Sequence, residues 1–156
     1  MSEGQAYRFS ICRLIGTLGV LCVIVGSIVI AGEAPPIFIN VPSGLITVGI
    51  TFFLLLGAYG GGFLRFIPAS LATLFCSPLK PNPLYAAIAK SGSRYAIGAG
   101  LIGALIGTVI VLKHAGYRSQ IGPGIAVALF TLLYAFFLSR VFFAFVYEAY
   151  TAKRDE

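Results

Sequence analysis

Acidic side chains are scarce in this sequence. Asp and Glu together number 5 in 156 residues, and charged residues make up only 10% of the chain. Soluble domains carry about 25% charged residues, so an ordinary soluble fold is excluded. A protein that moves ions usually places an ionisable group at mid-membrane. Here every acid falls outside the membrane spans predicted below or at the cytoplasmic end of one: Glu3, Glu33, Glu148, Asp155 and Glu156. Either the chain moves no ion, or a partner helix supplies the carboxylate.

Groups that could hold a metal or perform catalysis are also few. Cys12, Cys22 and Cys76 are odd in number and lack metal-ligand spacing, which favours a packing role. The single histidine, His114, lies in a predicted hinge, and we interpret it as a solvated loop residue rather than a ligand or proton relay. No nucleophile and base pair, phosphate-binding loop or metal cluster can be assembled from this sequence. We therefore expect a non-enzyme with no metal and no cofactor.

Apolar residues are abundant instead. They make up 58% of the chain, and its mean hydropathy is +0.96. This composition predicts an all-α integral membrane protein with room for four spans of about 20 residues each. No cleavage site follows the first apolar run, so the first span is expected to stay in the mature protein. The predicted order is a cytoplasmic tail (1–10), spans one and two (11–64), a short cytoplasmic loop with a surface helix (65–94), spans three and four (95–147) and a second cytoplasmic tail (148–156).

Proline and glycine set the boundaries within these segments. Pro42 is well placed to open span two, predicted over 43–64, because proline suits the first turn of a helix. The surface helix is predicted over 68–76, span three over 95–112 and span four over 124–147. Span four would be roughly 36 Å long, which exceeds a hydrocarbon core of about 30 Å. It should therefore tilt or protrude.

Positive charge is distributed unevenly along the chain. Only Lys113 and Arg118 fall on one predicted side of the membrane, and the other side holds Arg8, Arg13, Arg65, Lys80, Lys90, Arg94, Lys153 and Arg154. The positive-inside rule then places both termini and the long loop in the cytoplasm. The net charge of +6 is explained by this topology, so no nucleic-acid partner is expected.

Small residues at helical spacing indicate close helix contacts. Gly16 and Gly19 in span one, and Gly103 and Gly107 in span three, are expected to pack copies of the chain against one another in a homo-oligomer. Thr131 in span four either lines a polar path or bonds to its own helix one turn back. Arg140 in the same span must snorkel, pair or face a polar cavity, and we favour snorkelling to the headgroups. The aromatic run 136–150 is expected to form an outward-facing belt.

Three segments of the sequence resemble a known family. They are Ile37-Phe-Ile-Asn-Val-Pro-Ser43, Gly100-Leu-Ile-Gly-Ala-Leu-Ile-Gly107 and Ile121-Gly-Pro-Gly-Ile-Ala-Val-Ala-Leu-Phe-Thr-Leu-Leu-Tyr134. In order and placement they are similar to the MotA/TolQ/ExbB proton-channel family, across all four spans. The closest branch is a flagellar stator A subunit (MotA-like) in truncated form. Only the 65–94 loop stands where motility members carry a large cytoplasmic domain, which argues against rotor contact.

The resemblance implies an inner-membrane ring, typically of five copies, around a dimer of single-span B-type (MotB/ExbD-like) subunits. In that family the B helix carries the ion-binding aspartate, and the third and fourth helices of the A subunit line the path. That division of labour would explain the missing carboxylate. By face, the positions expected to line the channel or contact the partner are Gly100, Ala104, Gly107, Ala128, Thr131 and Ala135.

The leading hypothesis is thus a subunit of a proton- or sodium-driven motor or channel complex of bacterial motility type, lining the ion path around a partner's transmembrane aspartate. The alternative is a non-conducting homo-oligomeric membrane protein of the same fold that encloses lipid or a partner helix. A third class is a small transporter or scaffold unrelated to stators.

Overall fold

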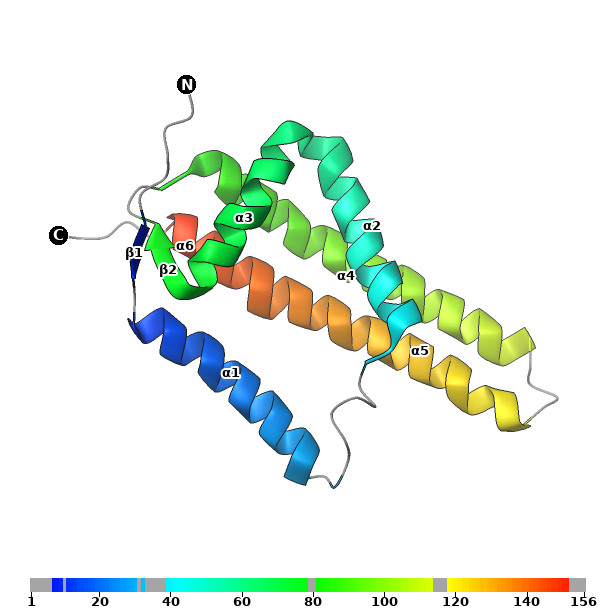
Figure 1. The fold of residues 1–156 in the computed structure, drawn as a ribbon. Coiled ribbons are helices and arrows are strands. Elements are labelled where there is room, and N and C mark those ends of the chain that lie inside the picture. Colours follow the sequence, from blue (N-terminus) through cyan, green and yellow to red (C-terminus); the bar gives the residue numbers. More distant parts are fainter. Residues whose placement is uncertain are drawn as a thin grey trace.

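Helices account for nearly all of the described chain. The computed structural model describes residues 7–9, 11–30, 32, 39–78, 81–113 and 118–151. A short antiparallel strand pair sets Tyr7 opposite Pro78, and apart from it the predicted all-α class is confirmed. Along the chain the elements are β1 (Tyr7–Phe9), α1 (Ile11–Ile30), α2 (Val41–Tyr59), α3 (Gly61–Phe75), β2 (Cys76–Pro78), α4 (Pro83–Lys113), α5 (Arg118–Phe136), the π-helix η2 (Phe137–Phe143) and α6 (Ala144–Thr151) (Figure 1).

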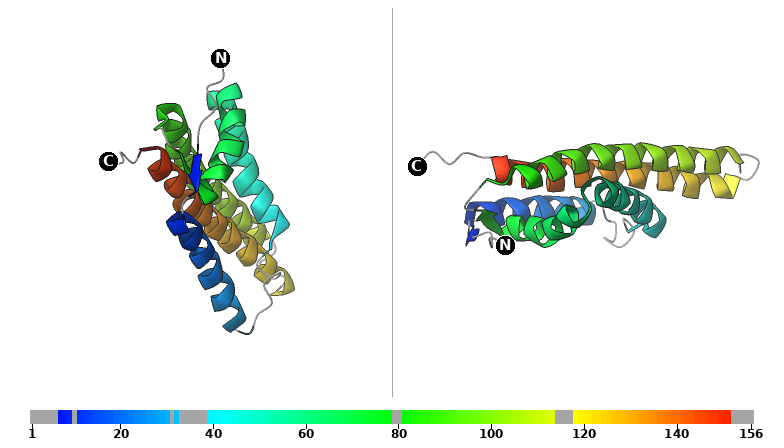
Figure 2. Two further views of the ribbon diagram at one scale, coloured as in Figure 1. Left: turned by 60° about the vertical axis from the view of Figure 1, so that its left-hand side comes forward. Right: turned by 90° about the horizontal axis from the view of Figure 1, so that it is seen from above.

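These helices form two layers. In one layer, α4 runs antiparallel to a continuous rod made of α5, η2 and α6 (Figure 1). The other layer holds α1, α2 and α3, which lie together on one side of that pair (Figure 2). α2 contacts both α4 and α5, whereas the contacts of α1 are mainly with α3 and β2. The α4–α5 pair is therefore covered on one side only within the described part of the chain.

Three helical stretches are long and apolar enough to cross a membrane. They are Val41–Tyr59, Pro83–Lys113 and Ile121–Thr151, the last of which joins most of α5 to η2 and α6. Within α1, the apolar segment Leu18–Ile30 is shorter than these. The structure thus supports a membrane protein with three helices of spanning length among its described residues, and the fourth span remains a prediction.

The boundaries of α2 follow from its end residues. Asn40 caps the start, since its side-chain oxygen accepts a hydrogen bond from the Ser43 backbone N–H at 3.1 Å. Pro42 occupies the first turn, as predicted. The helix ends at Tyr59 rather than in the middle 60s, because Gly60 adopts a positive φ of 51° and turns the chain into α3. A helix does cover nearly all of the predicted segment 68–76: it is α3, which begins at Gly61 and carries Pro68 inside it. Its place at the membrane surface stays a prediction.

α4 is longer than the predicted third span. It begins at Pro83, twelve residues before Tyr95, and runs to Lys113 without a break. The Asn82 side-chain oxygen accepts hydrogen bonds from the backbone N–H groups of Leu84 and Tyr85 at 3.1 and 3.3 Å, and Pro83 fits the first helical position. Much of the predicted 65–94 loop is therefore helical. Predictions that concern His114, Lys80 or the chain beyond Thr151 lie outside the described residues.

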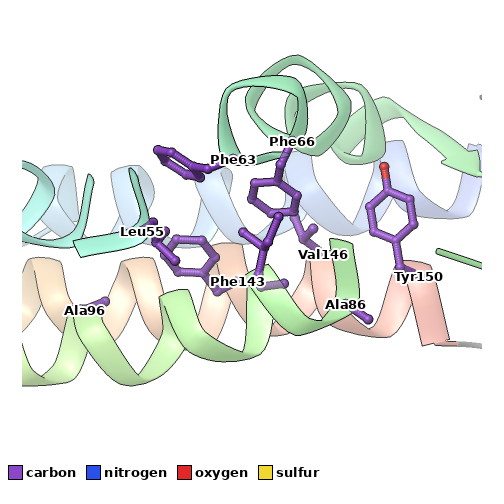
Figure 3. Close-up of a cluster of buried hydrophobic side chains, with 10 residues drawn as sticks. Leu55, Phe63, Phe66, Ala86, Ala96, Phe143, Val146 and Tyr150 are labelled. Atoms are coloured by element: carbon purple, nitrogen blue, oxygen red, sulfur yellow. The ribbon is translucent and has the colours of Figure 1, made fainter. Parts of the chain in front are cut away.

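One apolar core joins both layers near the end of the molecule that holds β1 and α6 (Figure 3). Phe66 of α3 points from above toward Phe143 and Val146, which come from the long rod (Figure 3). Phe63 of the same helix contacts Phe52 of α2, with ring centroids 5.2 Å apart. Tyr85 links this cluster to Tyr150 through edge-on ring contacts with centroid separations of 5.7 Å and 5.3 Å. Phe143 and Tyr150 are buried, whereas Phe136 and Phe137 are exposed. The expected outward aromatic belt is therefore only partly outward: its inner half forms the core.

Candidate functional site

The α4–α5 contact is built from small residues that let the two backbones approach closely. A Cβ placed on Gly107 would lie 2.7 Å from the backbone nitrogen of Ala128, and one on Gly103 would lie 2.6 Å from Cγ2 of Thr131. Gly100 meets Ala135 in the same way. No larger side chain fits at these glycines without moving a helix. The predicted small-residue faces therefore meet each other within one chain.

Thr131 is fully buried at this contact, with 0% of its side chain exposed. Its hydroxyl donates to the backbone carbonyls of Val127 and Ala128, both at 2.9 Å. Of the two interpretations of this threonine, the structure shows the hydrogen bond to its own helix one turn back. Its own carbonyl accepts a long hydrogen bond, 3.4 Å, from the hydroxyl of Thr47. Thr131 thus serves helix packing in the isolated chain.

A row of buried polar residues on α2 fixes that helix to α5. Ser43, Thr47 and Thr51 recur every four residues and are at most 2% exposed. The Ser43 hydroxyl donates to the Val127 carbonyl at 3.2 Å, and the backbone N–H of Asn40 donates to the Tyr134 hydroxyl at 2.8 Å. Hydrogen bonds of this kind hold helices together in lipid. Sequence reasoning missed the row, although the four-residue spacing of hydroxyls in an apolar span was its visible signal.

The six positions predicted to face a channel or partner do not share one environment. Gly100, Gly107, Thr131 and Ala135 are buried between α4 and α5. Ala104 and Ala128 are half-buried, and of these two Ala128 contacts Gly107. The buried four pack between the two helices, although Ala135 also borders a shallow hollow on the outside of the pair. In the single chain these small residues close the α4–α5 hairpin. Their role as lining residues in a ring of copies stays a prediction.

A different surface of the pair is available, and we call it the open face. Its members follow steps of three and four on each helix and are half-buried or exposed: Ile97, Leu101, Ala104 and Thr108 on α4, and Ile125, Leu129, Leu132 and Phe136 on α5. The two rows meet over a shallow hollow lined by Ile97, Leu101, Leu132, Ala135 and Phe136. Thr108 supplies the only hydroxyl among these eight side chains, and it donates to the Ala104 carbonyl at 2.8 Å.

The glycines of α1 differ from those of α4. Gly16 and Gly19 are exposed, and a Cβ on either would meet nothing within 4 Å. Gly16 also borders an apolar groove of about 390 Å³ between α1, α3 and the long rod, together with Phe142 and Phe145. The predicted role of Gly16 and Gly19 in packing copies thus remains sterically open. Gly103 and Gly107, in contrast, already contact Thr131 and Ala128 of the same chain.

Charged groups lie only at the margins of this site. Arg140 is exposed in η2, one turn beyond Phe136. Next to it, the hydroxyls of Ser139 and Ser93 are 2.7 Å apart, which ties η2 to α4. Glu148 on α6 is the single acid in the described ranges, and no group of three His, Cys, Asp or Glu residues that could hold a metal occurs there. The described helices offer packing surfaces and cations, but no carboxylate at mid-span.

Comparison with known protein families gave a match that covers the helices of this site. The sequence model of the MotA/TolQ/ExbB proton channel family matches residues 84–156, which comprise α4 from its second residue, α5, η2 and α6. No curated protein matched the chain. The family match supports the resemblance over the helix pair that forms the candidate site, and the segment Ile37–Ser43 lies outside the matched residues.

Proposed function

We propose that this chain is the A-type subunit of an ion-driven membrane complex of the MotA/TolQ/ExbB kind. It would line a proton or sodium path around a carboxylate carried by a single-span B-type partner. The observation that carries the proposal is the family match over residues 84–156. The lack of any acid in the described helices before Glu148 fits a division of labour in which the partner binds the ion.

Within the family we favour a stator-like, truncated form assembled as a pentamer in the bacterial inner membrane. The absence of a glutamate early in the last span, where Ala126 and Ala128 stand, supports that branch over the TolQ/ExbB branch. Rotor contact is not part of the proposal, because no large domain separates α2 from α4. The role is non-enzymatic and needs no cofactor. Purification in mild detergent with subunit counting tests it: a chain that is monomeric and never co-purifies with a single-span protein contradicts it.

The open face is the surface we assign to the ion path and the partner helix. Its side chains are half-buried or exposed in the single chain. The helices α1, α2 and α3 cover only one side of the α4–α5 pair (Figure 2). Ala104 is the one position of the predicted set that belongs to the open face. Thr108 takes the polar role first considered for Thr131, because it is an exposed residue of this face.

Thr108→Val should therefore slow ion flux by about fivefold in vesicles that contain chain and partner, through the loss of about 1 kcal/mol of hydrogen bonding to the passing ion or water. Thr131→Val is the matched control, since it removes a hydroxyl that is buried at the Gly103 contact. The ion flux of Thr131→Val should equal that of the unmodified chain. A slower flux in Thr131→Val with an unaltered flux in Thr108→Val would overturn the assignment of the path to the open face.

The proposed orientation has both termini and α3 in the cytoplasm, and it has the segment 113–120 outside. A Ser119→Cys variant, with the three native cysteines replaced, should react with a membrane-impermeant maleimide added to intact cells. A cysteine introduced at Ser2 should react only after the membrane is opened. If the cysteine at position 2 reacts in intact cells and the one at position 119 does not, the proposed orientation is wrong.

One observation favours a second candidate function. Seven of the eight open-face side chains are apolar, and apolar constrictions exclude water. Without a partner's charge, this face would enclose lipid or a helix and conduct nothing. Flux that stays at background after every co-purifying partner has been restored would favour this non-conducting role.

A further inference from the structure

Three exposed cations gather at the inner end of the open face. Lys90 and Arg94 lie on α4, one turn apart and just before Ile97, and Arg140 follows Phe136 by one turn. The hydrogen bond between Ser93 and Ser139, 2.7 Å long, sets the two helices side by side at this level. Arg94 and Arg140 are the residues that directly follow this pair, so they belong to the same level of the bundle.

The two arginines also lie at the same depth. Each is 19 residues from the outer end of its apolar stretch of spanning length, which lies at Lys113 for Arg94 and at Ile121 for Arg140. That separation is roughly 28 Å at 1.5 Å per residue. A hydrocarbon core is about 30 Å thick. If the α4–α5 turn marks the outer boundary, both guanidinium groups reach the inner headgroup layer, and Lys90 lies about 6 Å further inward.

No acid on the open face balances these charges. In the part of the chain that the structure describes, the only carboxylate is Glu148, about 12 Å further along the helix from Arg140. Outward from the arginines the surface is apolar: Leu101 is 56% exposed and Phe136 is 55% exposed. A ligand that fits both features has an anionic head and two hydrocarbon tails. Guanidinium groups bind phosphate oxygens well, often in pairs.

We propose that Arg94 and Arg140 together bind the phosphate of an anionic phospholipid of the inner leaflet, whose acyl chains run outward over Leu101 and Phe136. Lys90 adds charge on the cytoplasmic side of the headgroup. The inference concerns the chain without a B-type partner. Leu101 and Phe136 belong to the open face that we assign to the partner helix, so the lipid and the partner would exclude each other there. Arg140 would then snorkel to the phosphate of this lipid.

The test is a lipid titration of the purified full chain in non-ionic detergent, read by native mass spectrometry. Phosphatidylglycerol should bind more tightly than phosphatidylcholine with the same acyl chains. Arg94→Gln or Arg140→Gln should each weaken phosphatidylglycerol binding about fivefold, and the double variant roughly 25-fold. Arg65→Gln is the matched control, because Arg65 is exposed on α3 in the other layer. Excess inorganic phosphate should not displace the lipid, since it offers no acyl chains.

Several results would overturn the proposal. Equal binding of both lipids, an equal loss in Arg65→Gln, or displacement by inorganic phosphate would each contradict a site built from Arg94 and Arg140. Retention of an acidic protein in place of lipid would assign the cations to that protein instead. If the double variant fails to fold, a phosphatidylglycerol with a photoreactive acyl chain decides on the native chain: crosslinks should map to peptides containing Leu101 or Phe136, and crosslinks confined to α1–α3 would refute the site.

Discussion

Gly107→Ala should destabilise the chain by about 1–3 kcal/mol, and Gly107→Leu should prevent the α4–α5 hairpin from closing. The new Cβ would lie 2.7 Å from the backbone nitrogen of Ala128 and 2.9 Å from its Cα. Backbone atoms in a helix cannot rotate away as a side-chain end can, so the two helices must separate. The free energy of unfolding in detergent, followed by circular dichroism during denaturant titration, measures the effect.

Gly98 provides the control on the same helix. A Cβ there would meet nothing within 4 Å, so Gly98→Ala should leave stability unchanged or raise it by up to about 1 kcal/mol through helix propensity. The sequence alone led us to expect that substitution of Gly107 breaks an oligomer. In the structure Gly107 contacts Ala128 of the same chain, so the substitution should first destabilise the single chain. A stable Gly107→Leu monomer with native helix content would show that the close contact is not required.

Phe66→Ala should cost about 3–5 kcal/mol, the range for removing a large aromatic side chain from a packed core. Phe66 is 1% exposed and lies between Phe63 and Tyr85, with ring centroids 6.4 Å and 5.7 Å away. Its loss would leave a cavity where α3 meets the inner end of the α4–α6 layer. Thermal unfolding in detergent should show a large drop in midpoint.

Leu64→Ala is the matched control for that experiment, because Leu64 lies on the same helix but is 53% exposed. It should change the stability of the detergent-solubilised chain by less than about 0.5 kcal/mol. Equal losses in both variants would mean that α3 is held by contacts on its outer side, and would remove the core in Figure 3 as the reason for its position.

Much of the fold could be predicted because lipid leaves the chain few choices. Long apolar runs must become helices, since a span must satisfy its own backbone hydrogen bonds. Pro42 and Gly60 mark the limits of α2 through backbone preferences that depend on neighbouring residues alone. α4 begins twelve residues before the predicted start of span three, because the polar residues between Lys90 and Arg94 are helical rather than part of a loop. Asn82 and Pro83 carried the true signal.

The partners of each face could not be predicted in the same way. A close helix contact is predicted by Gly100, Gly103 and Gly107. A face of small residues does not determine whether the neighbouring helix belongs to the same chain. Thr131 illustrates the difficulty, because a hydroxyl in a span can face a path or its own helix equally well by sequence. Only the antiparallel pairing, with Gly103 opposite Thr131, decides between them for the single chain. Because Gly100, Gly103, Gly107 and Thr131 are buried between α4 and α5, the open face consists of other residues of the pair, which are half-buried or exposed.

The π-helix η2 has a consequence for the phase of the last span. Thr131, Ala135, Ser139 and Phe143 are all buried toward α4 and recur every four residues. In a regular α-helix each step of four advances the side chain by about 40° beyond a full turn, so such a row would wind away from a straight neighbour. The wider turn of η2, with hydrogen bonds from residue i to i+5, takes up this drift. The last span is thus continuous in length, but its α5 and η2 parts differ in helical phase. As a result, Thr131 and Ala135 in the outer part and Ser139 and Phe143 in the inner part all stay directed at α4.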